Sequence, residues 1–274
     1  MVQDYRIGQE VTGKRASRHH VHAQGSGKDT LIFSHGFGTD QSAWSAVAPH
    51  FAERARCILF DLPGAGPLLP EDFDARLYGS IAGYADDLLN LLDELEIEKC
   101  RYIGHSVSGM IGLLAAIEAP HRFDQLLLLN ASARYLNDTS YVGGFEKAAL
   151  EHLLGEMARN YHGWVAGFTP QAIPSGRPEA VSEFAASLLA MRPEVSVQIS
   201  RMIFQTDIRT LLPHVHVPTV LLQSRDDIAV PPEASRWMAQ QIEDAELVWI
   251  DAQGHLPHLS APDAIIEALD ERLH

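Results

Sequence analysis

Short, continuously apolar segments alternate with longer amphipathic segments along most of this chain. Strands inside a parallel sheet are buried on both faces and therefore have such continuous apolar sequences. Their alternation with helices predicts an α/β fold with a mostly parallel, doubly wound sheet. The predicted strands are 30–34, 58–61, 101–104, 126–130, 219–223 and 247–250, with an antiparallel edge strand at 18–24. The predicted helices are 83–95, 106–119 and 262–273.

The alternation stops between residues 131 and 212, where no strand is predicted. Helical stretches separated by prolines follow one another there, at 144–160, 161–167, 179–191 and 193–205. We expect residues 132–212 to form a helical cap, inserted into a core made of residues 1–131 and 213–274. The cap would cover the carboxyl edge of the sheet, where ligands bind in open α/β sheets.

The net charge and the cysteine content limit the classes of binding partner and the cellular compartment that we expect. The chain has 36 acidic and 21 basic residues and a net charge of −15, so its surface repels nucleic acids and anionic lipids. Cys57 and Cys100 lie in apolar strands and offer no disulfide framework. The N-terminal sequence has no apolar signal segment, and no apolar run approaches about 18 residues. We therefore expect a cytoplasmic protein that binds neither membrane nor nucleic acid.

No cofactor and no metal are predicted. The first strand is not followed by a glycine-rich dinucleotide-binding sequence, and no P-loop occurs. His214 and His216 could lie on one face of a strand, but the sequence offers no third ligand nearby.

The segment Tyr102–Met110 carries the candidate nucleophile, Ser106. An apolar strand leads into Gly104, and an apolar helix begins just after Ser106, so the serine lies on a sharp strand-to-helix turn. The residues two before and two after it must be small, and Gly104 and Ser108 meet this condition. The pattern is therefore G-x-S-x-S. The alternative is a serine that only caps the helix.

The segment His35-Gly36-Phe37 follows the strand at 30–34 and predicts an oxyanion hole. In such a fold one donor is the backbone N–H after the nucleophile, here Val107, and the other comes from an earlier loop, here Phe37. Glycines allow the close backbone approach that this requires. The alternative is an ordinary glycine-rich turn.

His255 and an aspartate complete the candidate catalytic group. His255 follows the last predicted strand, as the general base should, and we interpret His258 as its structural neighbour. The strand at 126–130 is followed by no carboxylate, whereas the strand at 219–223 is followed by Asp226 and Asp227. Asp227 is favoured as the acid that orients His255, with Asp226 as the alternative.

Other polar residues are interpreted as structural. Asp86 and Asp87 are expected on a polar helix face, and 18–22, which is rich in histidine, on a solvated edge strand. Trp44 is expected in the core.

Five segments resemble the strigolactone and karrikin receptor hydrolases of plants: His35–Trp44, Gly104–Ser108, Tyr135–Asp138, Gly143–Glu146 and Gly254–Ser260. The bacterial RsbQ-type regulators of stress sigma-factor control share the same skeleton. The resemblance spans nearly the whole chain. It departs at 62–67, which affects the floor of the expected pocket.

The resemblance implies the α/β-hydrolase fold, with a four-helix V-shaped cap inserted after strand 6 over a deep apolar pocket. It implies Asp227 rather than Asp226 as the acid. It also implies that the pocket is lined by Phe37, His105, Tyr135, Trp164 and Phe168. The alternative for the two cap aromatics is packing between cap and core.

Two functions remain open. The first is a serine hydrolase that cleaves a small hydrophobic ester or lactone, such as a butenolide, through an acyl-enzyme. The second is a sensor that hydrolyses its ligand slowly and signals to a regulatory protein, such as one that contains a PAS domain.

Overall fold

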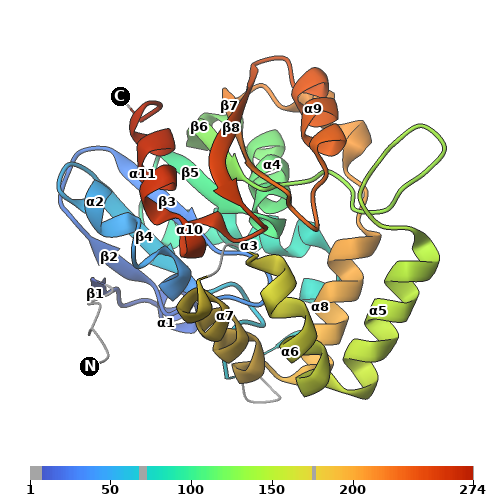
Figure 1. Ribbon diagram of the computed structural model, residues 1–274. Helices are drawn as coiled ribbons and strands as arrows, with labels where there is room; N and C mark the ends of the chain where they lie inside the picture. Colours follow the sequence, from blue (N-terminus) through green and yellow to red (C-terminus); the bar gives the residue numbers. More distant parts are fainter. Residues whose placement is uncertain (1–7, 68–72, 175–176, 274) are drawn as a thin grey trace.

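A twisted eight-stranded sheet forms the centre of the computed structural model, which describes residues 8–67, 73–174 and 177–273 (Figure 1). The strand order is β1-β2-β4-β3-β5-β6-β7-β8; β2 pairs antiparallel with β1 and β4, and all other pairs are parallel. This confirms the predicted mostly parallel sheet. The strands are β1 Gln9–Glu10, β2 His22–Gln24, β3 Thr30–Ser34, β4 Arg56–Phe60, β5 Cys100–His105, β6 Phe123–Leu129, β7 Thr219–Arg225 and β8 Ala245–Gln253.

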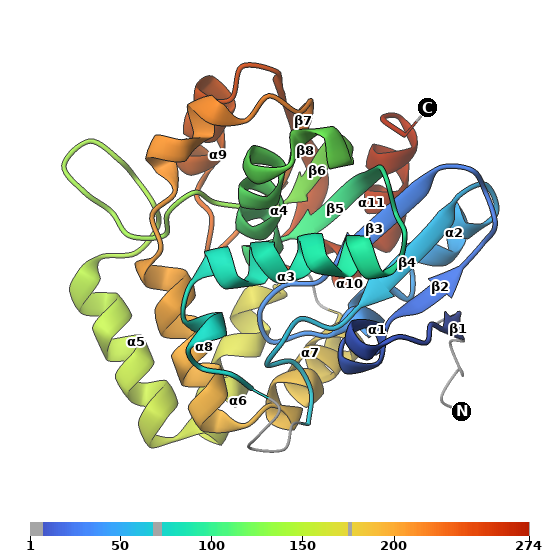
Figure 2. The ribbon, with the colours of Figure 1, turned by 180° about the vertical axis from the view of Figure 1, so that it is seen from behind.

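Helices cover both faces of the sheet, which explains why its strands are apolar throughout. In β3, Leu31 and Phe33 pack on one face while Ile32 packs on the other. The first face is covered by α2 (Ala48–Ala52) and α11 (Pro262–Asp270), and the second by α3 (Ile81–Glu94), α4 (Val107–Glu118) and α9 (Pro232–Gln241) (Figures 1 and 2). Shorter helices are η1 Gln41–Trp44, η3 Leu77–Gly79, η4 Pro120–Arg122, η5 Arg209–His214 and α10 Pro257–Ser260.

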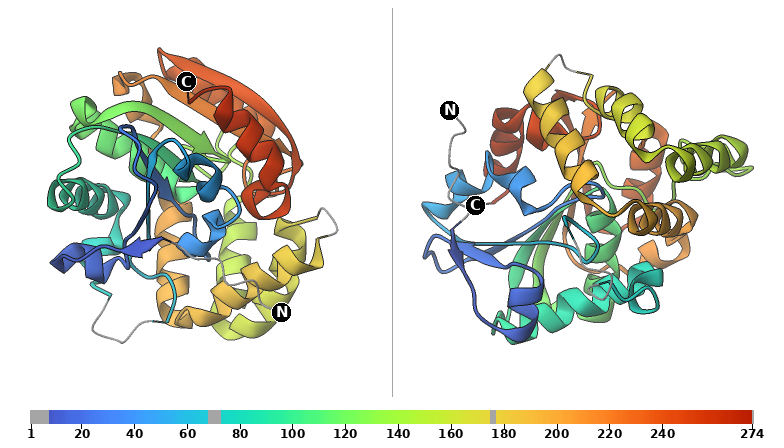
Figure 3. Two further views of the ribbon diagram at one scale, coloured as in Figure 1. Left: turned by 90° about the vertical axis from the view of Figure 1, so that its left-hand side faces the viewer. Right: turned by 90° about the horizontal axis from the view of Figure 1, so that it is seen from below.

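Four α-helices lie between β6 and β7 in the described residues: α5 Lys147–Arg159, α6 Tyr161–Ala172, α7 Pro178–Ala190 and α8 Pro193–Gln205. Helix α5 packs against α6 and α8, and α6 packs against α7. All four gather at one end of the sheet (Figure 3). We propose that residues 132–212 form the cap and that 1–131 and 213–274 form the core; the outer ends of that core, 1–7 and 274, lie outside the described residues.

Helix α6 is longer than predicted. It continues through Pro170 to Ala172, whereas the sequence suggested an end near residue 167. Proline lacks the N–H that would bond to the carbonyl four residues earlier. Ala166 and Pro170 are both exposed, so water can satisfy that carbonyl.

The N-terminal segment differs from the prediction. The expected strand at 18–24 begins only at His22, and Lys14–Arg18 form the short helix α1. The Glu94 carboxylate accepts hydrogen bonds from the backbone N–H groups of Arg15 and Ala16, each at 2.8 Å, and so fixes the start of α1.

The predictions of a solvated 18–22 segment and an exposed Asp87 are wrong for His19 and Asp87. Both side chains are only 3% exposed, and they form an ion pair of 2.9 Å. Asp87 faces the N-terminal segment because the helix that carries it packs against α1.

No helix in the three described ranges combines the length and apolar character that crossing a bilayer requires.

Candidate active site

Ser106 lies between the last residue of β5 and the first residue of α4. Its backbone angles, φ 56° and ψ −118°, are far from those of the strand and the helix that it joins. Such a strained turn projects the side chain away from both elements. The Ser106 side chain makes no capping hydrogen bond to α4, so the helix-cap alternative does not describe this serine.

The neighbours of Ser106 explain the G-x-S-x-S pattern. A Cβ atom on Gly104 would lie 2.8 Å from the carbonyl oxygen of Ser108, so only glycine fits there. The Ser108 hydroxyl donates to the carbonyl of His35 at 2.5 Å and lies 2.8 Å from the hydroxyl of Ser34. The second serine therefore ties the turn to the end of β3, where the predicted oxyanion loop begins.

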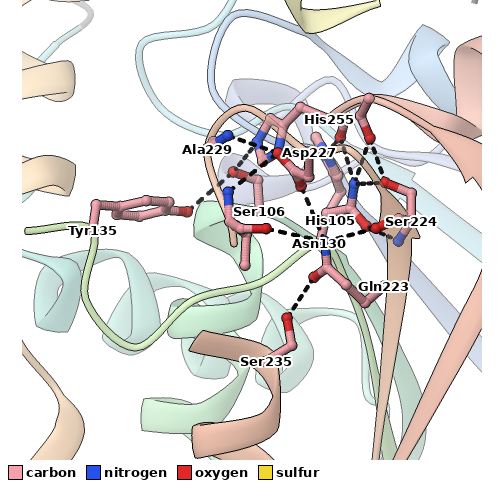
Figure 4. Close-up of polar contacts among 12 residues, drawn as sticks. His105, Ser106, Asn130, Tyr135, Gln223, Ser224, Asp227, Ala229, Ser235 and His255 are labelled. Atoms are coloured by element: carbon pink, nitrogen blue, oxygen red, sulfur yellow. Dashed lines mark hydrogen bonds and ion pairs between the residues drawn. The ribbon is translucent and has the colours of Figure 1, made fainter. Parts of the chain in front are cut away.

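His255 joins Ser106 to Asp227 (Figure 4). Its Nε2 lies 2.9 Å from Ser106 Oγ, and its Nδ1 lies 2.9 and 3.0 Å from the two carboxylate oxygens of Asp227. The histidine follows β8 and Gly254, whose φ of +83° favours glycine. This arrangement can move a proton from the hydroxyl to the imidazole while the carboxylate orients the ring.

Of the two candidate aspartates, the structure brings Asp227 to His255. The Asp227 side chain is fully buried and accepts backbone N–H groups from Ala229 at 2.8 Å and Val230 at 3.2 Å. Asp226 is exposed, and its φ of +53° forms the turn that directs the next residue inward.

Phe37 and Val107 border an apolar cavity beside Ser106, with about 320 Å³ of empty space when the solvent at its mouth is included. Val107 is the first residue of α4, where backbone N–H groups have no partner within the helix. Gly36 lies so close to His105 that any Cβ there would overlap it. Cavity residues from the core are His35, Gly36, Phe37, Gly38, Thr39, Leu62, Pro63, Gly64, Ala65, Tyr84, Val107 and Ile111, and those from the cap are Met191, Ile199, Met202 and Ile203.

Tyr135, Trp164, Phe168 and His105, which were predicted to line the pocket, are not among the residues that border this cavity. Tyr135 is almost fully buried, and its hydroxyl lies 3.3 Å from Ser106 Oγ. Burial raises the pKa of the Tyr135 phenol, so it stays protonated. Trp164 and Phe168 stack on each other along α6, with ring centroids 4.9 Å apart, outside the residues that line this cavity.

His105 lies behind the candidate nucleophile. Its Nε2 donates to the His255 carbonyl at 2.7 Å, which leaves Nδ1 without a proton. Burial holds the pKa of His105 well below its usual range, and nearby His258 and His255 lower it further. His258 stacks on Trp44, with ring centroids 4.6 Å apart, in the core.

Sequence reasoning missed a group of buried polar residues behind His255 and Asp227. Gln223 Nε2 lies 3.3 Å from an Asp227 oxygen, and Ser235 donates to Gln223 Oε1 at 2.9 Å. Asn130 and Ser224 bond to each other at 2.8 Å. The only signal in the sequence was a polar residue at the end of an apolar strand.

Within the described part of the chain, no three His, Cys, Asp or Glu side chains gather as metal ligands would.

A profile described as the Alpha/beta hydrolase family matches residues 31–268. The chain belongs to the alpha/beta hydrolase family. A strigolactone esterase of Pisum sativum is 45% identical over 252 residues, which cover 91% of this chain and 94% of the relative. A karrikin insensitive 2 receptor of Petunia hybrida is 42% identical, covering 93% and 96%. These matches confirm the resemblance and the hydrolase class inferred from the sequence.

The fold agrees closely with that of a solved family member. A hydrolase from Oleispira antarctica superposes with a TM-score of 0.90 and 31% identity, covering 94% of this chain and 95% of that chain. The match includes the helices between β6 and β7, because so much of both alpha/beta hydrolase chains is covered.

Proposed function

We propose that this chain is a serine hydrolase that cleaves the ester or lactone bond of small hydrophobic molecules. The observation that carries this proposal is the line from Ser106 Oγ through His255 to Asp227, with 2.9 Å at each step. Names of relatives support the ester bond as target, since the Pisum relative is named an esterase.

The proposed reaction has two halves. Ser106 attacks the substrate carbonyl while His255 takes its proton, and the N–H groups of Phe37 and Val107 stabilise the negative oxygen that forms. His255 then protonates the leaving oxygen, which leaves an acyl-enzyme on Ser106. Water, activated by the same histidine, releases the acid and restores the serine.

The cavity supports a small and apolar substrate. The described residues that line it include no Lys, Arg, Asp or Glu, so none of them would compensate a charge on the bound molecule. Even with the solvent at its mouth included, the empty space is only about 320 Å³, so the substrate must be small. We propose a compact ester or a lactone ring such as a butenolide as the substrate.

A contact between site and cap favours a second candidate, a sensor that hydrolyses its ligand slowly and signals to a protein partner. The backbone N–H of His255 donates to the carbonyl of Ala172, at the end of α6, at 2.8 Å. A Cβ on Gly254 would collide with Ala172 and Pro174. A ligand that shifts the histidine loop would therefore also shift the cap, and one relative is named a receptor.

The test is a steady-state assay of wild type and Ser106→Ala with p-nitrophenyl acetate and a fluorogenic butenolide. We expect Ser106→Ala to lose at least about 10⁴-fold in kcat with an unchanged melting temperature, since the nucleophile is removed and no packing is lost. Hydrolysis at the wild-type rate in this variant would refute the proposal. A single slow turnover of the butenolide, with a ligand-dependent melting shift, would favour the sensor.

A further inference from the structure

Asn130 ends β6 in a conformation that few residues adopt. Its φ is +49°, a region that asparagine tolerates better than most residues other than glycine. Its exposed fraction is 0%. A buried amide is costly unless its hydrogen-bonding groups find partners, so the partners of Asn130 show what the residue does.

Those partners belong to the two strand ends that carry Asp227 and His255 (Figure 4). Asn130 Nδ2 lies 2.8 Å from Ser224 Oγ, 3.0 Å from the Gly254 carbonyl and 3.2 Å from the His255 carbonyl. Its Oδ1 accepts the backbone N–H of Ser224 at 3.0 Å. The Ser224 hydroxyl in turn donates to the Gly254 carbonyl. One side chain thus links the ends of β6 and β7 to the loop after β8.

We propose that Asn130 is a positioning residue that keeps His255 aligned with Ser106 and Asp227. The backbone carbonyl of His255 accepts hydrogen bonds from both Asn130 Nδ2 and His105 Nε2. Two donors to one carbonyl fix the backbone of His255 and therefore the position from which its imidazole extends. Asn130 Oδ1 also accepts the backbone N–H of Ser224, which lies near the end of β7, just before the turn that carries Asp227. This inference rests on the proposed serine-hydrolase function.

The residue type agrees with this role. The site needs a donor for the carbonyls and the hydroxyl, an acceptor for one N–H, and a positive φ. Aspartate would supply the acceptor without the donors, and glycine would supply only the φ. These two residues therefore make informative substitutions.

The experiment measures kcat and KM for Asn130→Asp and Asn130→Gly with p-nitrophenyl acetate. We expect kcat to fall about 10- to 100-fold with KM changed less than about two-fold, because a displaced base slows the chemical step more than binding.

Thr219→Val is the matched control. Thr219 is buried at the opposite end of β7, and its hydroxyl donates to the Val217 carbonyl at 2.8 Å. This variant loses a buried hydrogen bond on the same strand, so it should lower the melting temperature and leave kcat unchanged. Ser224→Ala, which interrupts the same network, replaces Asn130→Gly if the latter does not fold.

Proton NMR of the wild type and Asn130→Asp gives an independent readout. The His255 Nδ1 proton, shared with Asp227, should give a far-downfield signal in the wild type and lose or shift it in the variant. Wild-type kcat and a wild-type NMR signal in Asn130→Asp would overturn the inference, as would an equal loss of kcat in Thr219→Val. Undiminished hydrolysis by Ser106→Ala would instead refute the proposed function itself.

Discussion

Among the described residues, the pairs His255–Asp227 and His19–Asp87 have the same length and lie in different surroundings. His255 and Asp227 are 2.9 Å apart, and so are His19 and Asp87. The first pair adjoins the hydroxyl of Ser106, on the histidine side. The second adjoins the hydroxyl of Tyr78 and the guanidinium of Arg15, both on the carboxylate side, with the Tyr78 hydroxyl at 2.8 Å.

This difference is what we expect if the first pair serves the proposed reaction and the second is structural. In the first pair, His255 Nε2 faces the hydroxyl of Ser106, which can give up its proton, and the His255 side chain is 12% exposed. In the second, the other nitrogen of His19 lies 2.8 Å from the backbone carbonyl of Asp61, and the ring is 3% exposed. We infer that the second pair anchors the N-terminal segment to α3, while the first performs chemistry.

Asp227→Asn should produce the largest effect, a loss of about 10⁴-fold in kcat, because an amide holds the imidazole in the wrong tautomer. The melting temperature should change little, since the shape of the side chain is kept. Steady-state kinetics with p-nitrophenyl acetate measure it, and Asp226→Asn, on the exposed neighbour, is the control. Comparable losses in both variants would contradict the assignment of Asp227.

Asp87→Ala should show the opposite behaviour. Removing one partner of a buried ion pair costs about 3–5 kcal/mol of folding free energy, because His19 is left buried without its carboxylate. The kcat of the folded protein should be unchanged. Urea denaturation and the ester assay test this. A loss of kcat at full stability would mean that the second pair also serves the reaction.

The comparison also marks what a sequence can reveal. That Ser106 and His255 come together was predictable because their signals are local: a strand, a small residue and a turn, in an order set by the fold. Asp87 was not, because its neighbours on α3 resemble an ordinary polar face and its partner lies far away in the sequence. The sequence favoured Asp227 over Asp226, and the positive φ of Asp226, which only the folded turn displays, adds a physical reason.

Positions that hold the site together were equally hidden. Asn130 reads as the end of an apolar strand, and its role appears only when β6, β7 and β8 lie side by side. The positions of the strands and cap helices were largely predictable. Strands buried on both faces have continuously apolar sequences, and prolines separate the helical stretches. The path of α6 past Pro170 was not, because it depends on which side of the helix faces water.

His258 is a histidine without a carboxylate partner, and burial is the main influence on its pKa, with a further lowering from nearby His255 and His35. Burial lowers its pKa from the usual 6.5 to about 3, and neither ring nitrogen has a hydrogen-bond partner among the described residues. Below about pH 6.5 the imidazole of His258 therefore binds a proton in the unfolded chain but not in the folded chain. Stability is complete above that pH and falls as the pH drops toward 3, by about 2 kcal/mol at pH 5.

His258→Phe should reduce this acid sensitivity, because phenylalanine can keep the stacking on Trp44 and binds no proton. Denaturation curves at pH 7 and pH 5 measure the difference for variant and wild type. Some sensitivity should remain from His105, whose pKa burial also lowers. An identical loss of stability in both proteins would show that His258 does not control it.

The smallest effect should come from the two tyrosines, one beside each pair. Tyr135 lies 3.3 Å from Ser106 Oγ, which becomes negatively charged as it leaves the acyl group in the second half of the proposed reaction. A hydroxyl donating to that oxygen contributes about 1.5 kcal/mol, so Tyr135→Phe should slow deacylation about ten-fold and acylation less. Tyr78→Phe should instead cost about 1 kcal/mol of stability with kcat unchanged. Burst kinetics with p-nitrophenyl acetate separate acylation from deacylation in Tyr135→Phe. Equal slowing of acylation and deacylation would indicate that Tyr135 contributes only packing.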